Sequence, residues 1–316
     1  MTLTEIVDIQ KIRADFPVLD QEINGKKLVY FDNAATTQKP IAVINALKHY
    51  YEFDNANIHR GIHTLAERAT RDFEATREAV RKFLGAASTE EIIFTSGATE
   101  GDNLGIKGVY EMYASKGNHI ITCTTEHKAV LDTCKHIEHL GGEVTYLPVA
   151  ANGLIDLTAL EAAIKPTTIL IAIMYANNEI GVVQPVKEIS AIAKKNGVLF
   201  FSDAVQAVGK IPVDVNADGI DIMAFTAHKM YGPKGIGALY VRRKNPRVKV
   251  TAQMDGGGHE RGMRSGTLNV PGIVGFGKAC ELARLEMAAD AERLSKLRDK
   301  LEAALTQIDE SYVNGS

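Results

Sequence analysis

The chain has 316 residues, of which 45% are hydrophobic and 24% are charged, values typical of a globular protein and unlike those of a disordered or collagen-like chain. Its formal net charge of -3 provides no strong positive field, so we expect no nucleic-acid or membrane partner and favour a small metabolite. The length predicts one large domain with a smaller appended lobe.

Signals for export, membrane insertion and metal binding are not expected from this sequence. Charged side chains interrupt residues 1–17, so no apolar core of a signal peptide can form there, and no later apolar run is long enough to span a bilayer. The three cysteines, Cys123, Cys134 and Cys280, are odd in number and scattered, which indicates free thiols in a reducing compartment. We therefore expect a cytoplasmic protein, and with no zinc-like spacing of Cys and His we expect no metal site.

Short apolar runs alternate with longer segments of helical periodicity along the chain. The predicted strands are 91–94, 119–122, 143–147, 168–174, 198–201, 222–225 and 238–241. The predicted helices are 64–84, 98–115, 128–140, 157–164 and 186–196, followed by a charged helical region from Val270 onward. Gly85, Gly141 and Gly197 follow three of these helices, where a left-handed cap favours glycine. The alternation predicts βα units and a mainly parallel sheet.

Three turns that follow predicted strands carry polar residues suited to a phosphorylated cofactor. Residues 95–100 form a small-residue turn before a helix, so backbone N–H groups and the Thr99 hydroxyl can bind a phosphate, although such a turn can also be a simple helix cap. His127 can stack on an aromatic ring and move protons, or can be structural. Asn178 offers an amide to a ring oxygen or to a substrate.

Two further strand ends point to pyridoxal phosphate. Asp203 can pair with the protonated ring nitrogen, or can be a helix N-cap, and Gln206 can reach the 3-oxygen of the ring. Lys229 stands between an apolar strand and a Gly/Pro turn, which suits a Schiff-base lysine that needs an immobile backbone and a lowered pKa. The alternative for Lys229 is a solvated turn residue. We interpret the combination as a pyridoxal-phosphate site.

Together these segments resemble the class V aminotransferase family, and within it the cysteine desulfurases, from about Tyr30 to the C-terminus. The resemblance implies an α/β protein of fold type I, with a mainly parallel seven-stranded sheet flanked by helices and a small, here incomplete, second domain. The implied division is an N-terminal segment of the small domain at 1–28, a large pyridoxal-phosphate-binding domain at 29–285, and the beginning of a truncated C-terminal small domain at 286–316.

Residue by residue, the resemblance implies three catalytic positions: Lys229 as the Schiff-base lysine, Asp203 as the partner of the ring nitrogen and His127 as the stacking residue. Asn178 and Gln206 correspond to the contacts with the ring oxygen. The phosphate-binding set that the resemblance implies is Ala98, Thr99, Thr226, His228 and, reaching across a homodimer, Thr267.

The function that the resemblance implies is conversion of L-cysteine to L-alanine, with the sulfur passed as a persulfide toward iron–sulfur cluster assembly. A sulfur-acceptor or iron–sulfur scaffold protein is then a further partner. Two alternatives stay open: another pyridoxal-phosphate enzyme of the same family, such as an aminotransferase or selenocysteine lyase, and a fragment that binds cofactor without turnover.

Two features depart from the family pattern. Residues 31–37 and 57–64 resemble the sulfur-mobilisation branch, whereas the segments from Ser96 through 256–267 resemble the housekeeping iron–sulfur branch, so the chain is a mosaic of the two. It stops at Ser316, where family members continue with the persulfide cysteine and the arginine that binds the substrate carboxylate. Since none of the three cysteines is predicted in a flexible loop, we expect cofactor binding with impaired turnover.

Overall fold

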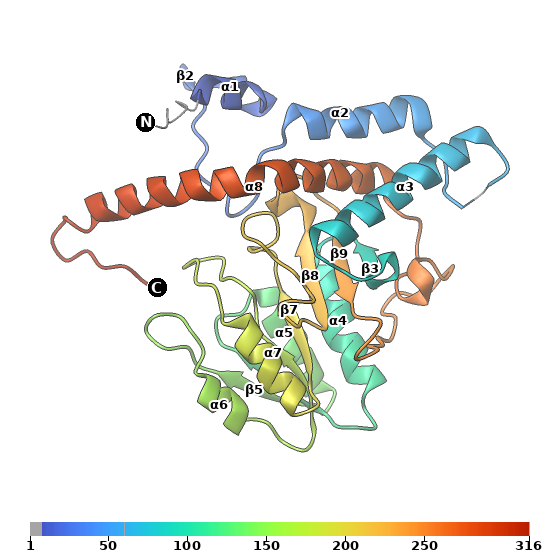
Figure 1. The fold of residues 1–316 in the computed structure, drawn as a ribbon, viewed down its shortest axis with the longest axis vertical. Coiled ribbons are helices and arrows are strands. Elements are labelled where there is room, and N and C mark those ends of the chain that lie inside the picture. Colours follow the sequence, from blue (N-terminus) through green and yellow to red (C-terminus); the bar gives the residue numbers. More distant parts are fainter. Residues whose placement is uncertain (1–7, 60, 316) are drawn as a thin grey trace.

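The computed structural model describes residues 8–59 and 61–315, and in these ranges helices cover both faces of a seven-stranded sheet (Figure 1). The first seven residues of the predicted segment 1–28, together with Arg60 and Ser316, lie outside the described part. The strands are β3 (Ile92–Thr95), β4 (His119–Cys123), β5 (Glu143–Leu147), β6 (Thr168–Ala172), β7 (Leu199–Asp203), β8 (Ile222–Thr226) and β9 (Gly237–Val241).

The strand order across the sheet is β3-β9-β8-β7-β6-β4-β5. The pairs from β8 through β7, β6 and β4 to β5 are parallel, whereas β9 runs antiparallel to both β3 and β8. The predicted mainly parallel, seven-stranded sheet is therefore confirmed. Since β3 runs in the same direction as β8, the carboxyl end of β3 lies at the same edge of the sheet as those of the parallel strands.

Helices on the two faces enclose separate hydrophobic clusters. One face carries α4 (Ala98–Met112) and α5 (Lys128–His139). The other carries α3 (Thr64–Phe83), α6 (Leu157–Ala162), α7 (Val186–Lys195) and the first half of α8 (Val270–Leu305). Ile92 and Phe94 of β3 face the second cluster and Ile93 faces the first, as the period of two in a strand requires. Burial on both faces explains why these strands are continuous apolar runs in the sequence.

Glycines end three of these helices in the predicted conformation. Gly85, Gly141 and Gly197 follow α3, α5 and α7 with φ of +67°, +89° and +66°. At these angles a residue with a Cβ is strained, so the glycines set where each helix stops before the next strand begins.

The N-terminal elements lie beside α8, above the sheet in Figure 1. They are α1 (Ile9–Ala14), the 3₁₀ turn η1 (Pro17–Asp20), the hairpin β1 (Glu22–Ile23) and β2 (Lys26–Lys27), α2 (Ile41–His49) and the π-helical turn η2 (Tyr50–Asp54). Three further 3₁₀ turns are η3 (Thr89–Glu91), η4 (Ala227–Lys229) and η5 (Glu260–Gly262). None of the helices in the described residues is long and apolar enough to cross a membrane.

Candidate active site

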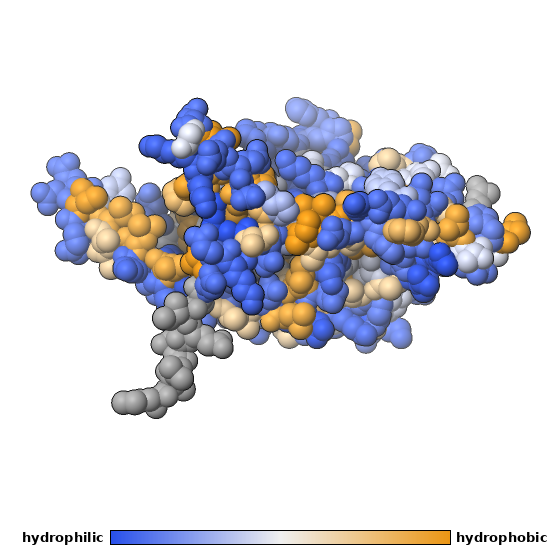
Figure 2. Space-filling view, turned by 90° about the horizontal axis from the view of Figure 1, so that it is seen from above, coloured by the Kyte–Doolittle hydropathy of each residue, from blue (hydrophilic) through white to orange (hydrophobic). Residues whose placement is uncertain are grey.

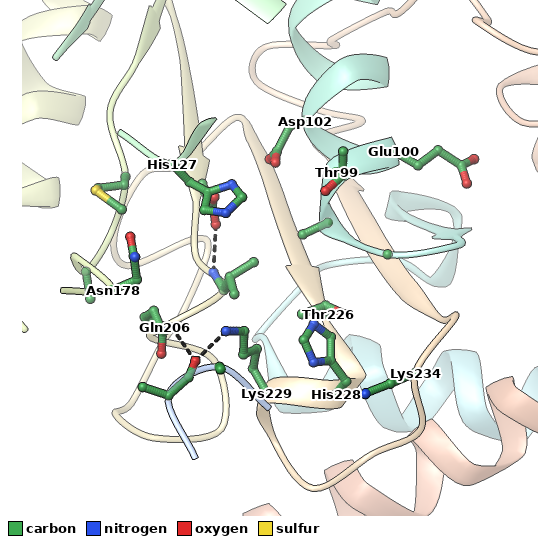
Figure 3. A pocket seen from close by; sticks show the side chains of 18 of the residues that line it. Thr99, Glu100, Asp102, His127, Asn178, Gln206, Thr226, His228, Lys229 and Lys234 are labelled. Carbon is green, nitrogen blue, oxygen red and sulfur yellow. Dashed lines mark hydrogen bonds between the residues drawn. The ribbon is translucent and has the colours of Figure 1, made fainter. Parts of the chain in front are cut away.

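A cavity of about 750 Å³ opens where β3, β4, β6, β7 and β8 end (Figure 3). The carboxyl edge of an α/β sheet is the usual place for ligand binding. The predicted cofactor residues that line the cavity are Ala98, Thr99, His127, Asn178, Asp203, Gln206, Thr226, His228 and Lys229. The tenth, Thr267, is exposed and is not part of this lining in the ranges that the structure describes.

Lys229 closes the 3₁₀ turn η4, directly after β8. Its Nζ donates a hydrogen bond to the carbonyl oxygen of Ala34, as Figure 3 shows. Burial lowers the pKa of Lys229, while the charges of Asp32 and Asp203 act in the opposite direction. The turn is fixed by backbone hydrogen bonds, among them Met230 N to Ala227 O at 3.0 Å. A lysine held in this way is easier to deprotonate than a solvated one.

Asp203 is the last residue of β7, and only 4% of it is exposed. Its Oδ1 accepts a hydrogen bond from the backbone N–H of Val205 at 2.9 Å. Burial raises the pKa of Asp203, against the Val205 N–H and the charges of His127 and Lys229, which lower it. Because residues 205–210 form turns and no helix, Asp203 is not a helix N-cap.

The N-terminus of α4 faces the cavity without a side-chain cap. Gly97 precedes the helix at φ +155°, and no side chain accepts from the first-turn N–H groups. A Cβ at Gly97 would stand 4.0 Å from the Thr226 hydroxyl oxygen, so the missing side chain keeps this space open. Uncapped N–H groups and the positive end of the helix dipole favour an anion there.

His228 adds an uncharged ring to the same end of the cavity. Burial and the positive charges of Lys229, Lys39, Lys234 and Lys210 lower its pKa to about 4, so the imidazole is neutral near pH 7. Its Nδ1 lies 3.2 Å from the hydroxyl oxygen of Thr36. A neutral imidazole can still donate one hydrogen bond to an anion.

His127 and Gln206 each have a side-chain orientation set by a neighbour. The Nδ1 of His127 accepts from the backbone N–H of Ala129 at 3.1 Å, which leaves Nε2 as the N–H donor of the neutral ring. Lys210 donates to Oε1 of Gln206, and Nε2 of Gln206 donates to the Ala34 carbonyl at 3.1 Å. Because the ammonium group of Lys210 can only donate, the amide atom that it contacts must be the oxygen, and the other must be the nitrogen.

Asn178 and the segment that contains Thr267 are each held by polar contacts of charged residues. Asn178 follows β6, and its amide donates to Oε1 of Glu179 at 2.8 Å. Near Thr267, Arg264 forms an ion pair with Glu100 of α4, Nε to Oε1 at 2.7 Å, and Glu100 also accepts from the backbone N–H of Ser96 at 2.7 Å. These contacts fasten the segment that contains Thr267 to the rim of the cavity.

Four residues that we did not predict line the cavity or interact with the predicted site residues. Ala34 is the shared acceptor of Lys229 and Gln206, Asp32 acts on the charge of Lys229, Lys210 orients Gln206, and Asp102 lines the cavity from α4. The spacing from Thr99 to Asp102 is one helical turn and could have revealed Asp102. The others come from distant segments with no local pattern.

The three cysteines are buried in the core. Each is at most 2% exposed, and burial raises the pKa of each thiol. None is part of the cavity lining among the described residues. They behave as small apolar core residues.

Comparisons with known proteins agree on one family. The family model for aminotransferase class-V matches residues 29–316. "Cysteine desulfurase IscS" of Anaeromyxobacter sp. (strain Fw109-5) is 55% identical over 289 residues, covering 91% of this chain and 71% of that protein. Two solved structures are each 42% identical to the chain. "NIFS-LIKE PROTEIN" has a TM-score of 0.84 over 88% of this chain and 76% of its own. "SspA in complex with cysteine" has a TM-score of 0.76 over 80% and 72%.

Proposed function

The chain belongs to the class-V aminotransferase family, and we propose that it is a pyridoxal-phosphate-dependent cysteine desulfurase. Bound pyridoxal 5′-phosphate draws electrons from the α-carbon of an amino acid. In this proposal the substrate is L-cysteine, and the products are L-alanine and a sulfur atom carried as a persulfide toward iron–sulfur cluster assembly. The strongest support is that a lysine of lowered pKa, a buried aspartate and an uncapped helix N-terminus line one cavity.

The donor set fits the phosphate end of the cofactor. We propose that the first N–H groups of α4 hold the phosphate together with Thr99, Thr226 and His228. The open space at Gly97 and the uncapped helix end support this assignment. A neutral His228 avoids burying a further cation beside the lysines, while its N–H remains available as a donor.

The side chains of Asp203, Gln206 and Asn178 suit the pyridine ring of the cofactor. We propose that Asp203 keeps a proton on the ring nitrogen, because its Oδ1 has a fixed backbone partner and the residue lines the cavity. His127 would stack on the ring and move a proton at Nε2. Gln206 would donate from Nε2 to the ring oxygen, a direction that Lys210 fixes, and Asn178 would donate beside it.

Lys229 is proposed as the covalent attachment point and as the base at the α-carbon. A lysine attacks a carbonyl carbon only as the neutral amine, which burial favours here. In the described structure its Nζ is hydrogen-bonded to Ala34, together with Gln206. Covalent attachment of the cofactor would remove the hydrogen bond from Lys229 to the Ala34 carbonyl. Gln206 would remain the donor to that carbonyl.

The sulfur-accepting thiol is not one of the three cysteines in this proposal. All three are buried, have raised pKa values and lie outside the cavity lining of the described residues. A thiolate is the nucleophile that takes sulfur, so a thiol that stays protonated and buried cannot serve. The same observation favours a second outcome for the 316-residue chain, cofactor binding without sulfur transfer.

A homodimer is proposed as the working form, in the cytoplasm, with a sulfur-acceptor or scaffold protein as a further partner. Phe31 and Ile62 are 95% and 96% exposed, and Val29 is 65% exposed. Large apolar side chains that are this exposed support an interface. In a dimer, Thr267 would reach the phosphate of the neighbouring subunit.

We also propose the domain division 1–28, 29–285 and 286–316. α8 continues through the boundary at 285, and its second half carries a stripe of exposed leucines. The stripe is Leu294, Leu297, Leu301 and Leu305. It lies at helical spacing, and Figure 2 shows hydrophobic residues on the part of the molecule that projects to the left. A small domain built around this half of α8 would bury these side chains.

Product analysis tests the proposed reaction. The protein is loaded with pyridoxal phosphate and given L-cysteine with dithiothreitol, which supplies the two electrons that release persulfide sulfur as sulfide, and alanine, sulfide and keto acids are quantified. Alanine with an equal amount of sulfide supports the desulfurase. A keto acid without sulfide supports an aminotransferase, and bound cofactor with no product supports binding without turnover.

A further inference from the structure

Asp102 is a buried carboxyl group in the wall of the cavity that the proposed reaction leaves unused. It is 1% exposed, and neither of its oxygens has a hydrogen-bond partner among the described residues. In Figure 3 it points from α4 into the region where His127 lies. Buried polar atoms without partners are rare in proteins, so a carboxyl group with two of them requires an explanation.

Glycines bring Asp102 this close to the sheet. A Cβ at Gly101 would stand 3.1 Å from the Cβ of Ala224, and one at Gly105 would stand 2.6 Å from Cε2 of Phe201. α4 therefore packs on β7 and β8 at a distance that only glycine allows. Asp102 lies on the same face of α4 as Thr99, one helical turn further along the helix. It lines the cavity together with Asp203.

The surroundings of Asp102 oppose a negative charge. Burial raises its pKa well above the usual range, and the charges of Asp203 and Glu126 raise it further. The charges that act on Asp102 are those of Asp203 and Glu126, and His127 and Lys229 line the same cavity. Burial also raises the pKa of Glu126, to about 8. Burial raises the pKa of Asp203 as well, but Asp203 differs from both because the charges of His127 and Lys229 favour its ionised form.

Resting on the proposed function, we propose that Asp102 is a positioning residue: it stays protonated and presents a carboxylic acid beside Asp203, so that Asp203 alone carries the negative charge facing the ring nitrogen. An ionised Asp102 would be a buried anion without a partner among the described residues, which is strongly unfavourable. A neutral one keeps a proton that it can donate within the cavity.

The sign of the pH effect follows from the raised pKa. The stability contributed by Asp102 is fully present below the unfolded pKa of about 4 and is lost as the pH rises toward the folded value. Asp102→Asn removes this dependence and keeps the shape of the side chain. Relative to the variant, the unfolding equilibrium constant of the parent is expected to rise by up to about tenfold per pH unit above pH 4.

The test uses the protein without cofactor, so it does not depend on the proposed reaction. Infrared spectra of protein labelled with ¹³C-aspartate are recorded near pH 7, and urea titrations are run from pH 5 to 9. The expected result is a protonated-aspartate band that is lost in Asp102→Asn and kept in Asp203→Asn. It is also kept in the control Asp132→Asn, an exposed carboxylate on α5.

Two results would overturn the inference: no protonated-aspartate band in the parent, or parallel stability profiles for the parent and Asp102→Asn. If Asp102→Asn does not fold, the spectra of the parent and of Asp203→Asn still show whether a protonated aspartate is present and whether it is Asp203. Loss of the band in Asp203→Asn would assign the proton to Asp203 and refute the proposal. Failure to bind pyridoxal phosphate would count against the proposed function alone.

Discussion

Arg77 of α3 and Glu260 of η5 form a buried, bidentate ion pair. Nη1 lies 2.9 Å from Oε2 and Nη2 lies 2.7 Å from Oε1. Oε2 of Glu260 also accepts from the backbone N–H of Phe94, and the guanidinium lies over the rings of Phe73 and Phe94. Glu260 and Arg261 have positive φ of +48° and +58°. The pair therefore holds a strained turn, which leads to Arg264 and Thr267, against β3.

Glu260→Ala should destabilise the protein by about 3 to 5 kcal/mol, because the buried guanidinium of Arg77 loses its bidentate partner and keeps only the half-exposed Glu74, 3.5 Å from Nε, as a counter-ion. Denaturant unfolding measures the loss. Glu78→Ala removes a partner from the more exposed pair with Arg81 and should cost only about 0 to 1 kcal/mol. Equal losses in the two variants would contradict the role given to the buried pair.

Asp203→Asn should retain pyridoxal phosphate and lose most exchange of the substrate α-proton with solvent. An amide carries no negative charge and cannot keep a proton on the ring nitrogen. Exchange is followed by NMR in deuterated buffer with L-cysteine or L-alanine, and cofactor binding by absorbance. Asp132→Asn serves as the control on the protein surface. Exchange as fast as in the parent would remove Asp203 from the mechanism.

Lys210→Met should change how stability depends on pH. Burial, with the charge of Lys229, lowers the pKa of Lys210 to about 8, below the unfolded value of about 10.4. Between these values the unfolded chain binds more protons, so Lys210 makes stability rise with pH. Relative to Lys210→Met, the unfolding constant of the parent should fall by up to about tenfold per unit across this window. Parallel profiles would mean that Lys210 keeps its charge.

The three thiols should be unreactive in the native chain. Cys123, Cys134 and Cys280 are buried, so a thiol reagent reaches them only in opened states, and labelling should be slower than in urea by about a thousandfold or more. With L-cysteine and cofactor, mass spectrometry should detect no stoichiometric persulfide on the chain. A persulfide on any of the three would show that the chain supplies its own acceptor.

Much of the sheet was predictable because its strands, apart from the partly exposed edge strand β5, are buried on both faces. The seven apolar runs coincide with β3 to β9 to within a few residues, and the glycine caps lie where helices stop. α1 and α2 were not predicted. α1 is short and has no buried residue, and α2 buries only Val43, so neither has a wide apolar stripe. Periodicity detects an element only where one face is clearly apolar.

The site was predictable where its residues end strands and not where they come from elsewhere. Asp203 and Lys229 follow apolar runs, so a local pattern indicates them. The carbonyl of Ala34 meets Lys229 across 195 positions, and Glu260 reaches Arg77 across 183. Such pairings depend on the packing of whole segments, which no spacing rule encodes. The lack of partners at Asp102 is likewise visible only in three dimensions.

Lys229 is proposed as the residue that binds pyridoxal phosphate covalently. The most direct test is to load the protein with cofactor, reduce it with borohydride and map the pyridoxyl group by peptide mass spectrometry. We predict a single modified site at Lys229, and no stoichiometric modification in Lys229→Ala. Modification of the neighbouring Lys210 or Lys234 in the parent, with Lys229 unmodified, would contradict the account.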